Sequence, residues 1–157
     1  MIAIIAEKPS VGQEIARVVG ATEKKDGYIT GNGYMVTWAL GHLVSLALPG
    51  TYGYTRTTAE DLPMLPEPFR LVERQIRTDR GMVTDIAAGR QLKVIDGVFS
   101  ECDSIIVATD AGREGELIFR WIYSHLGCTK PFKRLWFSSL TDEAIRKGMA
   151  DLREGYE

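Results

Sequence analysis

Runs of apolar residues alternate with amphipathic segments along this chain, and the alternation predicts a β/α fold. Residues 2–6 are apolar without interruption, and residues 105–108 form a second run of the same kind. Such runs are typical of central strands in a parallel sheet, where both faces of the strand are buried. Apolar residues at helical spacing follow each run, over residues 10–19 and again over residues 117–126. Gly20 is expected to end the first of these helices.

A hairpin is predicted between the two β/α units. Residues 28–30 and 34–38 are rich in β-forming side chains and flank a Gly-Asn-Gly turn. The Asn-Gly pair accepts the positive φ angles that a tight turn between two strands requires. A loop rich in proline and glycine is expected over residues 48–68, and a short strand within residues 69–76.

The second half of the chain repeats the β/α alternation. Helical spacing predicts a helix over residues 82–99 with a break at Gly89, and residues 132–137 predict another strand. Thr141 is the expected N-cap of a last helix that ends near Leu152. The order predicts an α/β fold with a Rossmann-like parallel sheet flanked by helices and an antiparallel hairpin insertion.

Length and charge limit the alternatives. The 157 residues predict a single domain over residues 1–157, with the hairpin and long loop inserted at about residues 21–76. A formal net charge of −2 gives no overall basic field, so DNA contacts must come from a local patch or from chain outside this sequence. Cys102 and Cys128 form no CxxC pair and are expected to be reduced thiols in a cytoplasmic protein. The apolar run at residues 2–6 is too short for a signal peptide or a membrane span, so no membrane partner is expected.

Acidic residues follow both apolar runs. Asp110, Glu114 and Glu116 come after the run at residues 105–108, and Glu7 comes after the first run. Because the carboxyl ends of parallel strands meet at one edge of a sheet, Glu7, Asp110 and Glu114 are expected to converge. Carboxylate oxygens at such an edge suit a hard divalent cation such as Mg²⁺.

Each of these features also has a purely structural explanation. Glu114 and Glu116 can occupy the first turn of a helix, where the helix dipole alone favours negative charge. Glu7 and Lys8 can form a solvated pair at the end of a strand. His42, in a Gly-His-Leu segment after the hairpin, is of a type that is more often a hydrogen-bonded structural residue than a catalyst.

Four motifs weigh against these alternatives. The sequence resembles the Toprim domain, the metal-dependent module shared by topoisomerases and primases. Within that superfamily it is similar to the amino-terminal domain of bacterial type IA topoisomerases of the topoisomerase III kind. The motifs that carry the resemblance are AEKPS at residues 6–10, GHL at 41–43, ATDAGREGE at 108–116 and FSSLT at 137–141. The resemblance implies an enzyme that cuts one DNA strand through a tyrosine ester, passes another strand through the gap and reseals the cut.

The resemblance also implies roles for the matching positions. Glu7 would be the acid/base near the scissile oxygen, and Lys8 would contact the phosphate. Glu7, Asp110 and Glu114 would form the site for Mg²⁺, with Mn²⁺ as an alternative ion. The chemistry agrees, since the alkoxide leaving group needs a proton and the phosphate needs a balancing charge.

The resemblance also implies supporting roles for Arg113, Glu116 and His42. Two departures from the family pattern affect the expected metal site and the expected nucleophile. The family's D-x-D motif reads Asp110-Ala111-Gly112 here, so the second carboxylate is missing and fewer protein oxygens would hold the metal. The family's nucleophilic tyrosine lies in a separate domain, and none of the six tyrosines in this chain has the required setting.

The chain is therefore expected to be an inactive fragment on its own. It would act together with the remaining topoisomerase domains on single-stranded regions of DNA. The alternative is a free-standing Toprim protein that serves as a nucleic-acid-binding or partner-binding module, or as a nuclease.

Overall fold

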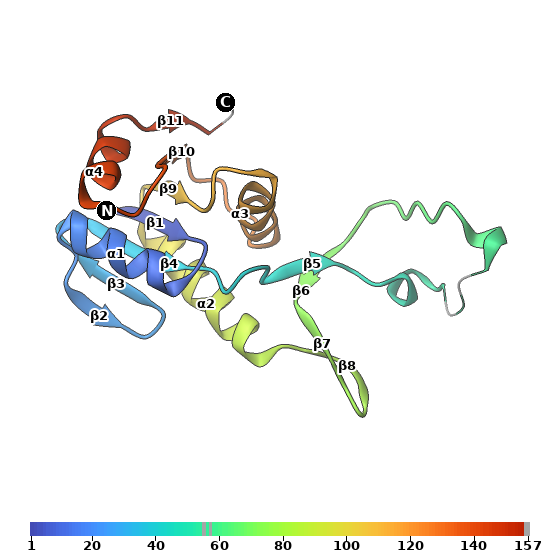
Figure 1. Cartoon of the computed structure of the whole chain (residues 1–157). Helices are drawn as coiled ribbons and strands as arrows, with labels where there is room; N and C mark the ends of the chain where they lie inside the picture. The colour runs from blue at the N-terminus through green and yellow to red at the C-terminus, as the bar shows by residue number, and fades with distance from the viewer. Residues whose placement is uncertain (55, 57, 156–157) are drawn as a thin grey trace.

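The computed structural model describes residues 1–54, 56 and 58–155, and its centre is a seven-stranded sheet (Figure 1). The strand order is β11-β10-β9-β1-β4-β3-β2. β1 (Ile2–Ala6) pairs in parallel with β9 (Ser104–Ala108) on one side and with β4 (Tyr34–Trp38) on the other. β10 (Phe132–Arg134) continues the parallel part beyond β9. The two uninterrupted apolar runs are thus neighbours at the centre of the sheet.

Helices cover both faces of this sheet. Because successive side chains of a strand point to opposite faces, β1 contributes to two separate cores. Its odd-numbered residues pack with α2 (Ile86–Glu101) and α3 (Arg113–His125), and its even-numbered residues pack with α1 (Pro9–Val19) and α4 (Asp142–Ala150). The result is the predicted α/β fold, with two helices on each face of a mostly parallel sheet.

The predicted hairpin is present and joins the main sheet. β3 (Tyr28–Gly31) pairs antiparallel with β4, and the turn places Asn32 at a φ of 50° and Gly33 at 83°. Two short antiparallel strands, β2 (Glu23–Lys25) and β11 (Arg153–Glu154), extend the two edges. The sequence did not predict either one, because their exposed charged residues carry no apolar alternation.

A long arm leaves the sheet after β4 (Figure 1). It contains the antiparallel pair β5 (Val44–Leu46) and β6 (Leu71–Glu73), with the 3-10 turns η1 (Pro49–Tyr52) and η2 (Ala59–Asp61) between them. Residues 55 and 57 of the expected loop lie outside the described part of the chain. The expected short strand is found as β6, and it is followed at once by a second hairpin, β7 (Gln75–Thr78) and β8 (Gly81–Thr84).

The helix predicted over residues 82–99 begins later and is unbroken. Met82 belongs to β8, and the helix α2 starts at Ile86 after the N-cap residue Asp85. Pairing with β7 satisfies the backbone of residues 81–84, and this tertiary contact outweighs their helical spacing. Gly89 does not break α2; it lets β6 pack closely, since an added Cβ would lie 2.8 Å from a carboxylate oxygen of Glu73.

Three other boundaries differ from the prediction. The strand expected to end at residue 137 ends at Arg134, and the last helix ends at Ala150. Helix α3 begins at Arg113, so the acidic residues after β9 lie partly in its first turn.

Both cysteines are free, as expected. Within the part of the chain that the structure describes, no helix is long and apolar enough to cross a membrane.

Candidate functional site

Three carboxylates predicted as metal ligands line one cavity of about 850 Å³. Glu7 follows β1 and Asp110 closely follows β9, and these strands are neighbours whose last residues, Ala6 and Ala108, are paired. Glu114 reaches the same cavity from the first turn of α3. The parallel pairing of β1 with β9 therefore brings together residues that lie more than a hundred positions apart in the sequence.

The loop after β9 is fixed by close backbone contacts. The Oε2 atom of Glu7 accepts a hydrogen bond from the Asp110 N–H at 3.2 Å. The buried hydroxyl of Thr109 donates to the carbonyl oxygen of Gly115 at 2.8 Å. Gly115 lies so near that an added Cβ would be 2.1 Å from the Asp110 carbonyl oxygen. A glycine at this position is what allows the loop and the start of α3 to approach.

His42 lies in the segment after β4, on the opposite side of β1 from β9, and it contacts Glu114. Its Nε2 atom lies 2.9 Å from Oε2 of Glu114, and its ring centroid is 5.6 Å from that of Trp121. The Nδ1 atom of His42 is buried and has no hydrogen-bond partner among the described residues. His42 thus joins the segment after β4 to the first turn of α3.

Arg74 holds this segment in place from the arm. Its guanidinium donates to the backbone carbonyl oxygens of Leu40 at 2.8 Å and of His42 at 3.1 Å. The same group ion-pairs with Asp85, the N-cap of α2, at 2.7 Å. The hydrogen bond from Arg74 lowers the pKa of Asp85 below its ordinary value, because it stabilises the charged carboxylate.

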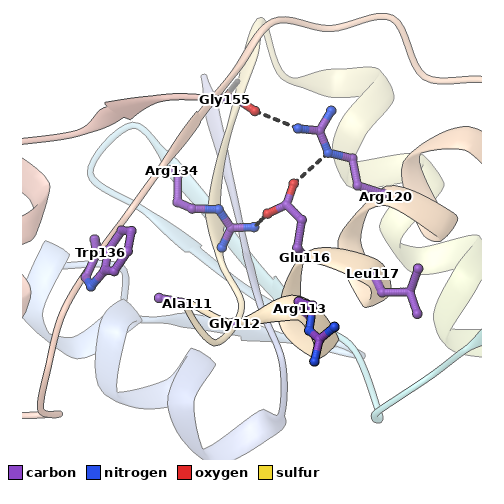
Figure 2. A pocket seen from close by; sticks show the side chains of 9 residues that line it. All are labelled: Ala111, Gly112, Arg113, Glu116, Leu117, Arg120, Arg134, Trp136 and Gly155. Carbon is purple, nitrogen blue, oxygen red and sulfur yellow. Dashed lines mark hydrogen bonds and ion pairs between the residues drawn. The ribbon is translucent and has the colours of Figure 1, made fainter. Parts of the chain in front are cut away.

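Glu116 does not line the acidic cavity. Its two oxygens accept from Arg134 and from Nε of Arg120, the latter at 2.6 Å (Figure 2). Arg134 is 8% exposed and also donates to the Thr109 carbonyl oxygen at 3.2 Å. Arg120 donates to the Gly155 carbonyl oxygen at 2.6 Å. Glu116, Arg120 and Arg134 line a second cavity of about 500 Å³. Their ion pairs connect α3 to the end of β10.

Arg113 and Lys8 lie at the surface around these two cavities. Arg113 lines both of them, whereas Lys8 lines neither and is exposed just before α1. Among the residues that the structure describes, neither side chain has an ion-pair partner. Both cations are therefore available to an anionic ligand, with Arg113 the nearer to the carboxylates.

The carboxylate oxygens that line the acidic cavity are of the type that binds a hard divalent cation. Glu7, Asp110 and Glu114 offer only carboxylate oxygens, which Mg²⁺ and related ions prefer. The described part of the chain holds no cluster of three acidic, histidine or cysteine side chains already gathered around one point. Glu114 is turned toward His42, and Glu7 toward the Asp110 backbone.

Sequence reasoning missed the arginines that support this site. Arg134 carried a usable signal, because a charged residue inside a strand of an α/β sheet is rarely buried without a partner. Arg120 also carried a signal, because it lies four residues after Glu116 in a predicted helix. Arg74 carried none, since its partners are a distant aspartate and backbone carbonyl groups.

The comparisons with known proteins agree with this architecture. The sequence profile of the Toprim domain family matches residues 2–140. DNA topoisomerase 3 of Bacillus subtilis (strain 168) is 46% identical over 158 residues, covering 98% of this chain and 20% of that protein. DNA topoisomerase 3 of Bacillus anthracis is 48% identical over 157 residues, covering 97% of this chain and again 20% of that protein. The chain thus spans about one fifth of the length of these curated relatives.

A solved structure shares the fold. Full-length topoisomerase I from Thermotoga maritima superposes with a TM-score of 0.58 at 19% sequence identity. The match covers 97% of this chain and 21% of that one. At this level of identity the likeness concerns the fold alone.

Proposed function

This chain belongs to the Toprim domain family, and we propose that it is the metal-binding catalytic module of a type IA DNA topoisomerase of the topoisomerase III kind. The observation that carries the proposal is the convergence of Glu7, Asp110 and Glu114 on one cavity at the carboxyl edge of the sheet. Relatives named DNA topoisomerase 3 that are 46–48% identical over nearly the whole chain support this choice among Toprim proteins.

In this proposal Glu7 handles the proton of the cleavage step. It is half-buried at the end of β1, and its Oε2 already accepts one hydrogen bond from the Asp110 backbone. The other oxygen, Oε1, remains to give a proton to the leaving 3′ oxygen and to take it back on religation. Lys8, exposed beside Glu7, would contact a phosphate of the bound strand.

The acidic cavity would hold Mg²⁺, or Mn²⁺ in its place, through Asp110, Glu114 and Glu7. When bound, the cation would balance the negative charge of the reacting phosphate. His42 would orient Glu114, and the pairing of Glu116 with Arg134 and Arg120 would hold α3 in position. Arg113 would add a positive charge at the rim of the cavity.

The nucleophilic tyrosine would come from another part of the enzyme. The substrate would be a single-stranded region of DNA, held between this chain and the remaining domains. The chain alone is therefore expected neither to nick nor to relax supercoiled DNA.

A chimera tests the proposal directly. This chain would replace the corresponding segment of the Bacillus subtilis DNA topoisomerase 3, which is 46% identical to it. We expect the chimera to relax negatively supercoiled plasmid in the presence of Mg²⁺. Glu7→Gln in the chimera should lower the cleavage rate by about 10²–10⁴-fold, the usual contribution of a positioned proton donor. Glu14→Gln is the matched control, since Glu14 is a carboxylate on α1 that does not line the cavity and pairs with Arg17 instead.

Two results would overturn the proposal. One is a chimera that melts cooperatively yet shows no relaxation under any Mg²⁺ or Mn²⁺ concentration. The other is full activity of the Glu7→Gln chimera, which would remove Glu7 from the chemistry.

A further inference from the structure

We propose that Trp136 and the cations around it form a stacking site for a single-stranded nucleic acid, beside the acidic cavity. The inference rests on the proposed function for the identity of the strand, and it assigns to residues beyond the metal site the task of holding that strand. The ligand class is an unpaired nucleotide segment, recognised through a base face and its flanking phosphates.

Trp136 stands at the edge of the sheet where the carboxylates also lie. It comes two residues after the end of β10, and β10, β9 and β1 are consecutive strands of the sheet. Glu7, Asp110 and Trp136 therefore follow three neighbouring parallel strands. Neighbouring strands are roughly 4.8 Å apart, so a strand of nucleic acid crossing this edge would pass all three within about 10 Å.

The ring of Trp136 is unusually accessible for its size. Trp136 is 44% exposed and lines two hollows. One is the cavity that Glu116 lines, and the other is a cavity of about 310 Å³ beside α4. Figure 2 shows the ring at the side of the first cavity, across from the Glu116–Arg134 pair. The guanidinium carbon of Arg153 lies 3.8 Å from its ring centroid. Core packing therefore does not account for this aromatic side chain.

Positive charge is concentrated on both sides of the ring. The two hollows are lined by five cations, Arg113, Arg120, Arg134, Lys147 and Arg153, against two carboxylates, Glu116 and Asp151. This local excess stands out in a chain whose formal net charge is −2. It supplies the local basic patch that the composition of the whole chain lacks.

Two of these cations, Arg113 and Lys147, are available to phosphate groups. Arg134 and Arg120 donate to Glu116. They add positive charge to the patch, but they are not expected to contact the phosphate groups directly. In the described part of the chain, Arg113 and Lys147 have no ion-pair partner, and Arg153 is placed over the indole ring. Arg113 and Lys147 therefore line the two hollows beside the exposed ring, one in each, while Arg153 lies over the ring itself.

An exposed indole ring flanked by Arg113 and Lys147, two cations that are unpaired among the described residues, suits a single strand better than a duplex. Bases of a single strand can stack on an indole ring or a guanidinium plane, while cations alongside follow the phosphates. The bases of a duplex are already stacked on each other and offer no free face. Stacking is tolerant of sequence, so the site is expected to bind without strong base preference.

The test measures binding of a fluorescently labelled oligo(dT) to the chain by anisotropy, at low salt and with EDTA so that no metal contributes. Trp136→Ala should raise the Kd about fivefold or more, in line with the loss of one base stack, and Trp136→Phe should restore part of the affinity. Lys147→Ala should also weaken binding. Lys93→Ala is the matched control, an exposed lysine on α2 that removes the same charge from a different helix, and it should bind like the parent.

Salt dependence separates the two kinds of contact. For single strands, each phosphate contact contributes about 0.7 to the slope of log K against log salt concentration. Lys147→Ala is therefore expected to lower that slope by about 0.7, whereas Trp136→Ala should weaken binding and leave the slope unchanged. Intrinsic fluorescence of the parent, compared with Trp136→Phe, should report quenching of Trp136 on binding.

Three outcomes would overturn the inference: no oligo(dT) binding by the folded parent, equal effects of Trp136→Ala and Lys93→Ala, or equal affinity for a duplex of the same length. None of these touches the metal site. Failure of the proposed function would show instead in the chimera carrying Glu7→Gln, so the two failures can be told apart.

Discussion

The Nε2 atom of His42 lies 2.9 Å from Oε2 of Glu114, which joins two segments that are 72 residues apart in the sequence. The contact links the turn after β4 to the first turn of α3, on the rim of the acidic cavity. Arg74 fixes the backbone of His42 by a hydrogen bond of 3.1 Å to its carbonyl oxygen. The orientation of Glu114 therefore depends on residues that belong to the arm.

His42→Ala is expected to weaken divalent-cation binding by about 10-fold or more, because a residue that orients a metal ligand typically contributes that much to affinity. Isothermal titration with Mn²⁺ would measure the change, and thermal melts without metal should shift little, since the side chain is 36% exposed. His125→Ala provides the control, as it is the only other histidine and lies at the far end of α3. An unchanged Mn²⁺ affinity in His42→Ala would show that the contact does not position Glu114.

Gly112→Asp should strengthen metal binding without straining the backbone. Gly112 has an extended conformation (φ −148°, ψ 175°), and nothing lies within 4 Å of an added Cβ. It is also the N-cap of α3, where an aspartate or asparagine can bond the free N–H groups. Gly112→Asn is the matched control, because it can cap the helix equally without adding charge. Only Gly112→Asp should enlarge the rise in melting temperature on adding Mn²⁺; an equal rise in both variants would place position 112 away from the metal.

Gly115→Ala should destabilise the protein although alanine is the better helix former. The added methyl group would lie 2.1 Å from the Asp110 carbonyl oxygen, so the loop or the helix must move. Forced overpacking of this kind typically costs about 1–3 kcal/mol. Chemical denaturation would measure the loss, with Gly97→Ala as the control, because Gly97 lies inside α2 and nothing lies within 4 Å of an added Cβ there. Equal stability of the two variants would mean that the loop accommodates the methyl group freely.

The ion pair between Arg74 and Asp85 should make stability depend on pH in the acid range. The hydrogen bond from Arg74 lowers the pKa of Asp85 in the folded state, so this stabilisation is fully present above the ordinary aspartate pKa of about 3.9. It is lost as the pH falls through the lowered value. The difference in melting temperature between the parent and Asp85→Asn should therefore be constant near neutral pH and shrink below about pH 4.

Asp96→Asn serves as the control for that comparison, because Asp96 is exposed on the same helix. Its difference from the parent should not follow the same acid-dependent course. A difference for Asp85→Asn that stays constant down to about pH 2, well below the ordinary aspartate pKa, would show that the ion pair does not stabilise the fold.

Much of the architecture could be predicted from local patterns in the sequence. The apolar runs at residues 2–6 and 105–108 identified the central strands, because only a strand buried on both faces tolerates such continuity. The Asn-Gly turn identified the hairpin, since few other residues accept positive φ angles. The carboxylates at the ends of these strands followed from the general rule that parallel strands end at one edge.

Element boundaries could be predicted less well. Residues 82–85 have helical spacing, yet pairing with β7 makes residues 81–84 a strand. β2 and β11 have charged, exposed residues and exist only because the sheet offers them an edge to pair with. In each case a long-range hydrogen-bonding partner outweighs the local preference of the segment.

The sequence by itself determined the fold class and placed acidic residues directly after the two central strands. The tertiary structure alone decided that Glu114 contacts His42, that Glu116 pairs with Arg134, and that Trp136 stands between two basic hollows. The periodicity of a sequence reports which face of a helix or strand is buried, because burial acts on each segment separately. The partner of a particular polar side chain depends on how the finished layers meet, and that is settled only when distant segments pack together.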